Sequence, residues 1–533
     1  MPFGKRTKVA DDPVQPVARL SKTRHWLHFG LVFAAAWAFL YHLQFRTEWL
    51  LSYDGWYHIK YAELLPSFGI QTEWKWAAQS VWAEHFADKQ LLYHAFLIPF
   101  TWFDNLATGM KHATVLLGAG AVTSFFAVLN LNRIRFPMLW AAVLLVASGE
   151  YFLFRLCLPR PHVASIILLL WSLHFLLNQR RIALCVVILV YSFSYAAFHV
   201  PFGLALILSG HILFTERRLE WKTPLVVFVA MLAGMLINPY FPENFRWFWM
   251  VNVMIPWTAA SGSVDLQMAD ELLPPTARDF LAAHLPILLG LVAAAWAGMT
   301  RKMVFATKTR ALFLILLVYF LLTAMNRRFV EYSVPVGLFF VAAFVTDAMR
   351  EVDLGTLWRA GGVKRKVLAG SALLTAIVFG VLAYTTYKGV RPRLYLPTPE
   401  RMGAALYLHE HTDDDELVFT CDWDDAPELF FFNPKNRYPV IMDPFYMYVH
   451  DPEFWKQWVA AANGMYLGRT YDILAPMYRY GVCTQGWTEI KAIVGKDPRM
   501  ELVFDDFGAF VFRIDQENPE IPLDQLMKMA PGD

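Results

Sequence analysis

The feature that most constrains this chain is a series of apolar stretches, each about long enough to cross a lipid bilayer. A transmembrane helix needs about 20 mostly apolar residues, with a range of about 17–25. Only 17% of the 533 residues are charged, whereas soluble domains carry about 25%. We therefore predict an α-helical polytopic membrane domain, solvated by membrane lipids, with about eleven spans in a range of about ten to thirteen. The candidate spans are residues 27–44, 110–130, 137–153, 163–178, 182–198, 201–215, 224–238, 285–299, 310–325, 330–348 and 366–386.

A further apolar stretch, residues 91–103, is interpreted as non-spanning. It holds about 13 residues and contains Pro99, which suits an interfacial or re-entrant helix better than a span. When it is left out, five basic loops fall on the same side as the basic residues 1–26, as the positive-inside rule requires. These loops carry Arg133 and Arg135; Arg180 and Arg181; Arg217, Arg218 and Lys222; Arg301, Lys302, Lys308 and Arg310; and Lys364, Arg365 and Lys366. We therefore expect a cytoplasmic N-terminus.

The same topology places two long loops, about 45–109 and 239–284, and the C-terminal residues 387–533 on the extracytoplasmic face. The C-terminal region has a soluble composition. Residues 416–423 (ELVFTCDW) are typical of a strand, residues 501–515 of a hairpin with its turn at Asp-Asp-Phe-Gly, and residues 451–480 mainly of helix. We predict a soluble α/β domain. Cys421 and Cys483 could pair in an oxidising compartment, or could stay as two free thiols.

Acidic side chains occur on the two long outer loops. Asp54 and His58 follow the first span amid aromatic residues. An acid in such a place can act as a base, as a metal ligand, or as an ordinary solvated charge. Asp265 and Glu271 belong to an acidic cluster in the second long loop, near Gly and Pro, which is also typical of a solvated loop.

Basic side chains occur on two short outer turns. Arg160 and His162 end one turn, where the positive-inside rule disfavours positive charge. A lipid phosphate would provide a partner, because arginine makes bidentate contacts with phosphate oxygens; the alternative is snorkelling to the headgroups. Arg327, Arg328 and Glu331 lie at the other turn, where Arg328 and Glu331 are three residues apart and could simply pair with each other.

All these acids and arginines face one compartment in the expected topology. Their combination is typical of a site for an anionic, lipid-linked substrate, with carboxylates available for acid–base chemistry. The formal net charge of only +2 gives no indication of a nucleic-acid partner.

Several short motifs resemble the GT-C superfamily of membrane glycosyltransferases, and most of all bacterial relatives of the catalytic subunit of oligosaccharyltransferase. The first loop carries an acid followed by Trp-Tyr-His-x-Lys in SYDGWYHIK, and a Trp-rich stretch follows it. Further similarities are Arg-Pro-His at 160–162, Asn-Pro-Tyr at 238–240, Arg-Phe-x-x-Tyr-x-x-Pro at 328–335 and DPFYMYVHDPEFW at 443–455.

This resemblance implies transfer of a sugar or oligosaccharide from a polyprenyl-phosphate or polyprenyl-diphosphate donor to a glycan, lipid or protein acceptor. Asp54 would be the catalytic acid of the first outer loop, residues 45–109. Glu271 or Asp265 would stand for the acid of the third outer loop, which is residues 239–284 here. Arg328 would hold the donor phosphate, with Arg160 and His162 as further candidates.

The chain also departs from the oligosaccharyltransferase pattern. The family's Asp-x-Asp metal-binding motif is missing from the second outer loop, which is the turn at residues 155–162 here. The need for Mg²⁺ or Mn²⁺ is therefore open, and Asp54 would be the metal ligand if there is one. The family's Trp-Trp-Asp-Tyr-Gly motif is matched only weakly by CDWDD at residues 421–425, where Asp422 or Asp424 would correspond to its aspartate and the Tyr-Gly is missing.

Two other classes of protein remain as alternatives. A transporter or flippase of a lipid-linked or anionic substrate usually has ionisable groups near mid-membrane and inverted repeats, whereas these spans are nearly free of charge and show no repeat. A membrane scaffold that presents the C-terminal domain would not bring the outer acids and arginines to one cavity.

Overall fold

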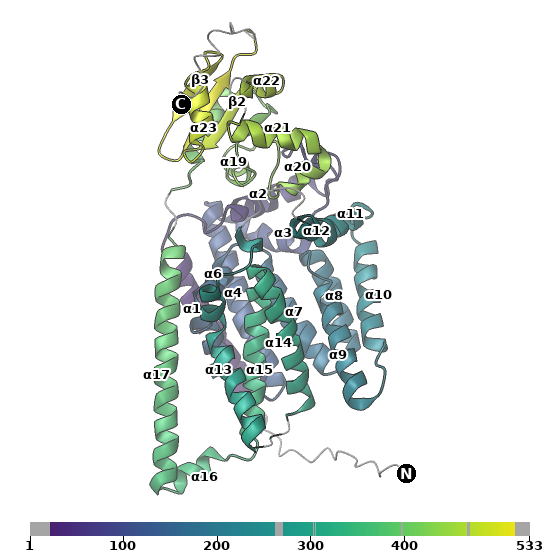
Figure 1. Cartoon of the computed structure of the whole chain (residues 1–533), viewed down its shortest axis with the longest axis vertical. Coiled ribbons are helices and arrows are strands. Elements are labelled where there is room, and N and C mark those ends of the chain that lie inside the picture. The colour runs from purple at the N-terminus through teal and green to yellow at the C-terminus, as the bar shows by residue number, and fades with distance from the viewer. Residues whose placement is uncertain are drawn as a thin grey trace.

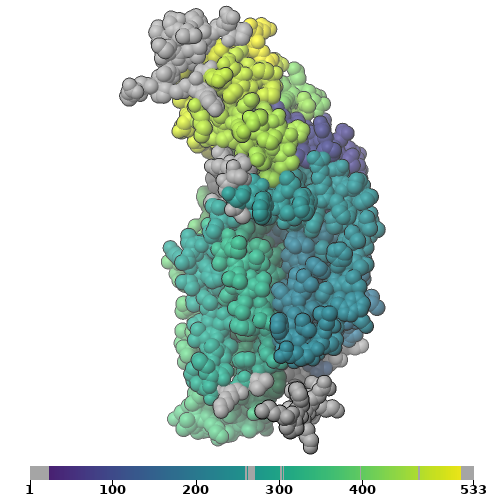
Figure 2. All heavy atoms as spheres, turned by 45° about the vertical axis from the view of Figure 1, so that its right-hand side comes forward, coloured from purple at the N-terminus to yellow at the C-terminus, as the bar shows by residue number. Residues whose placement is uncertain are grey.

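The computed structural model describes residues 22–261, 270–301, 303, 305–395, 398–465 and 469–517. A bundle of helices carries a smaller α/β region at one end, and the molecule is elongated (Figures 1 and 2). A polytopic helical membrane domain followed by a mixed α/β region is the architecture that the sequence predicts.

Six helices among the described residues are long and apolar enough to cross a membrane. They are α1 (Lys22–Gln44), α4 (Leu106–Leu131), α13 (Ala277–Arg301), α14 (Thr307–Met325), α15 (Val330–Ala348) and α17 (Gly362–Arg393). Besides residues Leu91–Trp102, the shorter apolar helices among the described residues are α7 (His162–Leu177), α8 (Arg181–Ser194), α9 (Val200–Glu216) and α10 (Lys222–Leu236). At 1.5 Å per residue, helices of 14 to 17 residues fall short of a hydrocarbon core of about 30 Å. The number of about eleven spans therefore stays a prediction.

The span expected at residues 137–153 is not one continuous helix. The structure has α5 (Pro137–Val146) and α6 (Glu150–Cys157), bent by 86° relative to each other. The break falls at Gly149, whose φ of +88° favours glycine, and whose added Cβ would meet the backbone of Ala282 and Ala283 at 2.9 Å. This bend turns α6, which carries Arg155, across the end of the bundle.

The start of α1 and the α/β region lie at opposite ends of the bundle. At the start of α1, His25 hydrogen bonds to Asn130 near the C-terminal end of α4. At the other end of α1, Arg46 donates to the hydroxyl of Tyr387 on α17, the helix that leads into the α/β region (Figure 1). Arg133, Arg180 and Lys308 from three of the basic loops line one hollow. These three basic loops therefore lie together at one end of the bundle, as the positive-inside rule predicts.

Short helices lie across the bundle end beneath the α/β region (Figure 1). They are α2 (Tyr53–Phe68), α3 (Leu91–Leu97), α11 (Glu243–Trp249) and α12 (Ile255–Ser261), with α16 (Leu354–Arg359) at the opposite end of the bundle. Single turns complete the connections at η1 (Val81–Ala83), η2 (Ile98–Trp102), η3 (Met250–Met254), η4 (Asp270–Leu272) and η5 (Arg327–Phe329). The apolar stretch 91–103 therefore forms α3 and η2, which pack on α2 as a peripheral element.

The α/β region contains one four-stranded sheet of order β1-β2-β4-β3. β1 pairs with β2 in parallel and the other pairs are antiparallel. The strands are β1 (Val418–Thr420), β2 (Tyr480–Thr484), β3 (Met500–Asp505) and β4 (Ala509–Ile514). The helices are α18 (Met402–His411), α19 (Ala426–Phe432), α20 (Phe445–His450), α21 (Pro452–Ala462), α22 (Thr470–Leu474) and α23 (Thr488–Val494). The expected strand and hairpin are present, while β2 begins at Tyr480, the last residue of the stretch expected to be mainly helical.

The Trp-rich part of the first outer loop shares a hydrophobic core with the α/β region. Trp74, Trp76 and Trp82 are buried in the same cluster as Phe430 and Tyr438. The indole of Trp76 donates to the carbonyl of Pro434 at 2.6 Å, and Ala77 forms a β-bridge with Tyr438. This common core fixes α2, and with it Asp54, against the loop that follows β1.

A disulfide joins Cys421 to Cys483, the pairing that the sequence left open. It ties the loop after β1 to β2, directly before Asp422 and Asp424. In the chain-entropy account, closing a loop of 62 residues contributes about 4 kcal/mol to the stability of the folded state.

We expect reduction of this disulfide to lower the thermal midpoint of the full-length protein in detergent. Thermal unfolding followed by intrinsic fluorescence, with and without dithiothreitol, measures the change. The variant Cys185→Ser is the control, because Cys185 is a free thiol away from this loop. An equal midpoint in oxidised and reduced protein would contradict a stabilising role.

Candidate functional site

A cavity of about 500 Å³ lies between the bundle end and the α/β region. Its lining includes residues from each loop and turn that carries candidate acids or arginines, so these side chains converge on one cavity. A membrane scaffold would not need this convergence. The charged and polar lining residues are Ser52, Tyr53, Asp54, His58, Lys89, Gln90, Tyr151, Arg155, Arg160, Glu271, Arg327, Arg328, Arg393, Thr398, Glu400, Asp424, Glu428, Asp443 and Tyr446.

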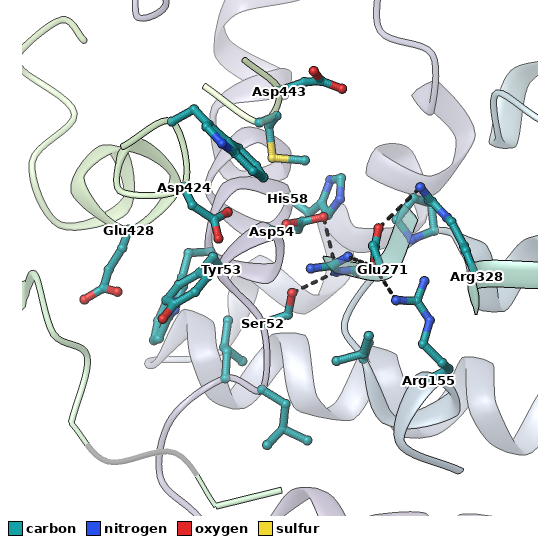
Figure 3. Close-up of a pocket in the computed structure, with 18 of the residues that line it drawn as sticks. Ser52, Tyr53, Asp54, His58, Arg155, Glu271, Arg328, Asp424, Glu428 and Asp443 are labelled. Atoms are coloured by element: carbon teal, nitrogen blue, oxygen red, sulfur yellow. Dashed lines mark hydrogen bonds and ion pairs between the residues drawn. The ribbon is translucent and has the colours of Figure 1, made fainter. Parts of the chain in front are cut away.

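One side of the cavity is built from three arginines around a single carboxylate. Glu271 contacts Arg155 Nη1, and it lies 2.8 Å from Arg160 Nη1 and 3.4 Å from Arg328 Nη1 (Figure 3). Burial opposes ionisation, but the three guanidinium groups overcome it and hold the pKa of Glu271 well below its usual value. Glu271 is therefore an anion, and it occupies a position that suits the oxygens of a phosphate.

Arg155 has a second carboxylate partner below the cavity. Its Nε donates to Glu331 Oε1 at 2.8 Å, and Glu331 is 1% exposed. Arg328 instead donates to the Tyr195 hydroxyl at 2.7 Å, so the local pair of Arg328 with Glu331 that the spacing suggested is wrong. The bend at Gly149 brings α6 to α15 and supplies Arg155 as the closer partner.

His162 lies beneath the cavity and does not line it. The side chain is buried, and its Nε2 donates to the Arg155 backbone carbonyl at 2.8 Å. The structure therefore places His162 against the backbone of Arg155 and outside the lining of the cavity. Arg327 does line the cavity, where its guanidinium lies 3.4 Å from the Pro274 carbonyl.

Asp54 lies between the two sides of the cavity, in the first turn of α2. Its Oδ2 is 3.2 Å from Arg160 Nε, which also donates to Ser52 Oγ at 2.8 Å. A carboxylate in the first turn of a helix is favoured by the exposed N–H groups there. Asp54 is therefore held as an oriented carboxylate that still faces the cavity.

The other side of the cavity is acidic. In Figure 3, Asp424 and Glu428 lie on the opposite side of Asp54 from Arg155 and Arg328. Burial, and then the charge of Asp54, raise the pKa of Asp424 to about 7. Glu428 accepts the Arg401 backbone N–H at 2.8 Å. Asp422 does not line the cavity, and burial followed by the charge of Asp425 raises its pKa to about 6.

Several lining residues were not candidates in the sequence analysis, among them Lys89 and Asp443. Lys89 donates to the Tyr446 hydroxyl at 2.8 Å, and Asp443 lies near it. Burial raises the pKa of Asp443 to about 6, even though Lys89 and Arg328 oppose that rise. The signal for Lys89 is its place in the first outer loop, between the Trp-rich stretch and the non-spanning apolar helix.

The donor set around Asp54 does not fit a divalent cation. The turn at residues 155–162, where an Asp-x-Asp motif would lie, carries Arg155 and Arg160 instead. The guanidinium of Arg160 forms an ion pair with Asp54 itself. Within the described residues, no group of three or more His, Cys, Asp and Glu side chains is placed to hold a metal ion. Asp265 lies outside the described residues.

No protein-family model matches the chain, and no curated protein matches its sequence. Solved structures do match its fold. The apo oligosaccharyltransferase of Archaeoglobus fulgidus is 14% identical with a TM-score of 0.64, covering 95% of this chain and 76% of its own. ArnT from Cupriavidus metallidurans bound to undecaprenyl phosphate is 13% identical with a TM-score of 0.54, covering 94% and 100%.

The arabinofuranosyltransferase AftD from Mycobacteria is 13% identical with a TM-score of 0.56, and the match covers 95% of this chain and 40% of that one. All three neighbours are glycosyltransferases of the GT-C type. At such identities the likeness concerns the fold, and it confirms that this chain has the GT-C fold that its short motifs predicted.

Proposed function

We propose that this protein is a membrane glycosyltransferase that uses a polyprenyl-phosphate or polyprenyl-diphosphate sugar as its donor. The observation that carries the proposal is one cavity at the bundle end that joins an oriented carboxylate, Asp54, to a group of arginines around Glu271. The GT-C fold supports it, since the neighbours with this fold are glycosyltransferases and one of them was solved with undecaprenyl phosphate.

The donor phosphate binds on the arginine side. The side chain of Arg328 is 35% exposed and that of Arg160 is 18% exposed, so both are reachable from the cavity. The cavity lies where the helices of the bundle end, so a polyprenyl chain can extend along the apolar bundle while its phosphate stays among the arginines.

The acceptor approaches from the side of Asp54 and Asp424. Its hydroxyl or amide attacks the anomeric carbon of the sugar as the bond from that carbon to the phosphate oxygen breaks. The phosphate leaves with the electron pair, and Arg160 and Arg328 hold the charge that develops on it. The acceptor proton passes to Asp54, which acts as the general base. A glycan, a lipid or a protein side chain all satisfy this chemistry.

The proposed compartment is the non-cytoplasmic face of a bacterial inner membrane. The disulfide between Cys421 and Cys483 supports it, because disulfides persist in oxidising compartments. The grouping of basic loops at the opposite end of the bundle supports the same orientation.

We expect Arg328→Ala to weaken binding of undecaprenyl phosphate by about 10- to 100-fold, since a hydrogen bond to a charged group contributes about 1.5–3 kcal/mol. Equilibrium binding to purified protein in nanodiscs measures the change. Arg246→Ala is the matched control, because Arg246 is an exposed arginine on α11 outside the cavity. Undecaprenol lacks the phosphate and should bind wild type and variant alike. Equal affinity of wild type and Arg328→Ala for undecaprenyl phosphate would overturn the donor assignment.

A further inference from the structure

Three buried polar side chains run in a line from the cavity into the first outer loop. His58 on α2 contacts His94 on α3, with 2.9 Å between Nδ1 of His58 and Nε2 of His94. His94 Nδ1 in turn lies 2.7 Å from Oδ2 of Asp88. The exposed fractions of His58, His94 and Asp88 are 1%, 1% and 5%.

The hydrogen bonds fix the direction of this line. Asp88 accepts the Gln90 backbone N–H through Oδ1, at 2.8 Å, so both its oxygens are acceptors. His94 Nδ1 must then carry a proton, and in neutral His94 the lone pair of Nε2 receives the Nδ1 proton of His58. Neutral His58 is therefore left with a lone pair on Nε2, and among the described residues the side-chain hydrogen bond of His58 is the one from Nδ1.

His58 ends the line at the cavity. It lies four residues after Asp54 on α2, so the two side chains share one face of that helix. Both line the cavity, and Figure 3 shows the ring of His58 beside Asp54. The charged and titratable groups around His58 are His94, Arg160, Lys89, His162, Tyr57 and Tyr93. Burial, followed by the charge of His94, lowers the pKa of His58 well below its usual value, which keeps it a neutral base.

We propose that His58, His94 and Asp88 form a proton relay that takes the acceptor proton from Asp54. This proposal rests on the transferase function above. The proton on Asp54 passes to Nε2 of His58, directly or across one water molecule, while the Nδ1 proton of His58 moves to Nε2 of His94. The imidazolium of His94 is then stabilised by Asp88, and Asp54 is ionised again. Return of the proton to water in the cavity resets the relay.

A purely structural role explains less of this geometry. Asp88 and His94 alone suffice to tie α3 to the chain before it. The contact of His58 with His94 also ties α2 to α3, but that tie does not require the second ring nitrogen of His58 to stay open, one helical turn from Asp54. In the relay, by contrast, each of the three groups has a defined donor or acceptor role.

The test uses Asp88→Asn, which keeps the side-chain size and the acceptor for Gln90 but removes the charge. We expect turnover of a polyprenyl-phosphate sugar to fall by about 10²-fold, the low end of a general-base contribution. Protonation of the relay should make wild-type turnover fall as pH decreases. Without the carboxylate the imidazolium is less stable, so this acidic limb should move to lower pH in Asp88→Asn. The affinity for undecaprenyl phosphate and the thermal midpoint should stay near wild type.

His94→Gln should lose turnover to a similar extent, while His409→Gln, which changes a histidine outside the cavity, should not. Asp88→Asn could instead lose donor affinity and thermal stability while the acidic limb of its pH profile stays unshifted. That result would show that the three residues have a structural role, and it would overturn the relay. Wild-type turnover and pH profile in Asp88→Asn would overturn it as well. If the wild-type protein neither binds undecaprenyl phosphate nor transfers a sugar from polyprenyl donors, the proposed function itself fails.

Discussion

Replacing Asp54 with asparagine is expected to lower the turnover of sugar transfer by about 10²- to 10⁴-fold, the contribution typical of a positioned general base. Asparagine keeps the size of the side chain and an oxygen for Arg160, which lies 3.2 Å from Oδ2 of Asp54. It cannot take up the acceptor proton. The loss should therefore appear in turnover, while the affinity for undecaprenyl phosphate stays within about twofold, because the arginines around Glu271 are unchanged.

The matched control is Asp415→Asn. Asp415, directly before β1, is also an acid paired with a cation, Lys75, at 2.6 Å, but it does not line the cavity. Turnover by purified full-length protein, with a synthetic polyprenyl-phosphate sugar, measures both variants. Unchanged turnover in folded Asp54→Asn protein would remove Asp54 from the mechanism. If that variant also kept moving lipid-linked substrate across vesicles, the transporter alternative would be favoured.

The grouping of the candidate loops at one end of the bundle is the part of the site that the sequence predicts best. The basic loops place the loops of Asp54, Glu271 and Arg328 on one face, and the structure brings all three residues to one cavity. Charge counting needs no knowledge of packing, because the membrane itself divides the loops between two compartments. Within those loops, the resemblance to GT-C proteins then singled out Asp54, Glu271 and Arg328 as candidates.

Partner identity could not be predicted in the same way. Arg328 and Glu331 are three residues apart, so local spacing favours them as a pair, but Glu331 pairs with Arg155, 176 residues away. That contact depends on the bend at Gly149, inside a stretch that its length and mostly apolar composition predicted to be one continuous span. Likewise His58 and His94 lie on separate helices, and their separation of 36 residues carries no periodic signal. Long-range packing decides each of these contacts.

Arg155→Met is expected to destabilise the folded protein by about 3–5 kcal/mol, the cost of removing one partner of a buried ion pair. Glu331 is 1% exposed and would lose the Nε contact at 2.8 Å, which leaves a carboxylate without its cation at the bundle end. Glu271 would also lose one of its three arginines. Thermal unfolding of the variant in detergent, compared with wild type, measures the effect.

The double variant Arg155→Met/Glu331→Leu separates stability from binding. Replacing a buried ion pair with apolar side chains of similar volume is often neutral or stabilising, so the thermal midpoint should return towards wild type. The affinity for undecaprenyl phosphate should be lower than in wild type for both the single and the double variant, because both lack the guanidinium that contacts Glu271 on the phosphate side of the cavity. If the double variant regained both the midpoint and the affinity, Arg155 would act only as the partner of Glu331. A low midpoint in the double variant would instead show that Arg155 stabilises the bundle end through Glu271, the contact that links α6 to the third outer loop.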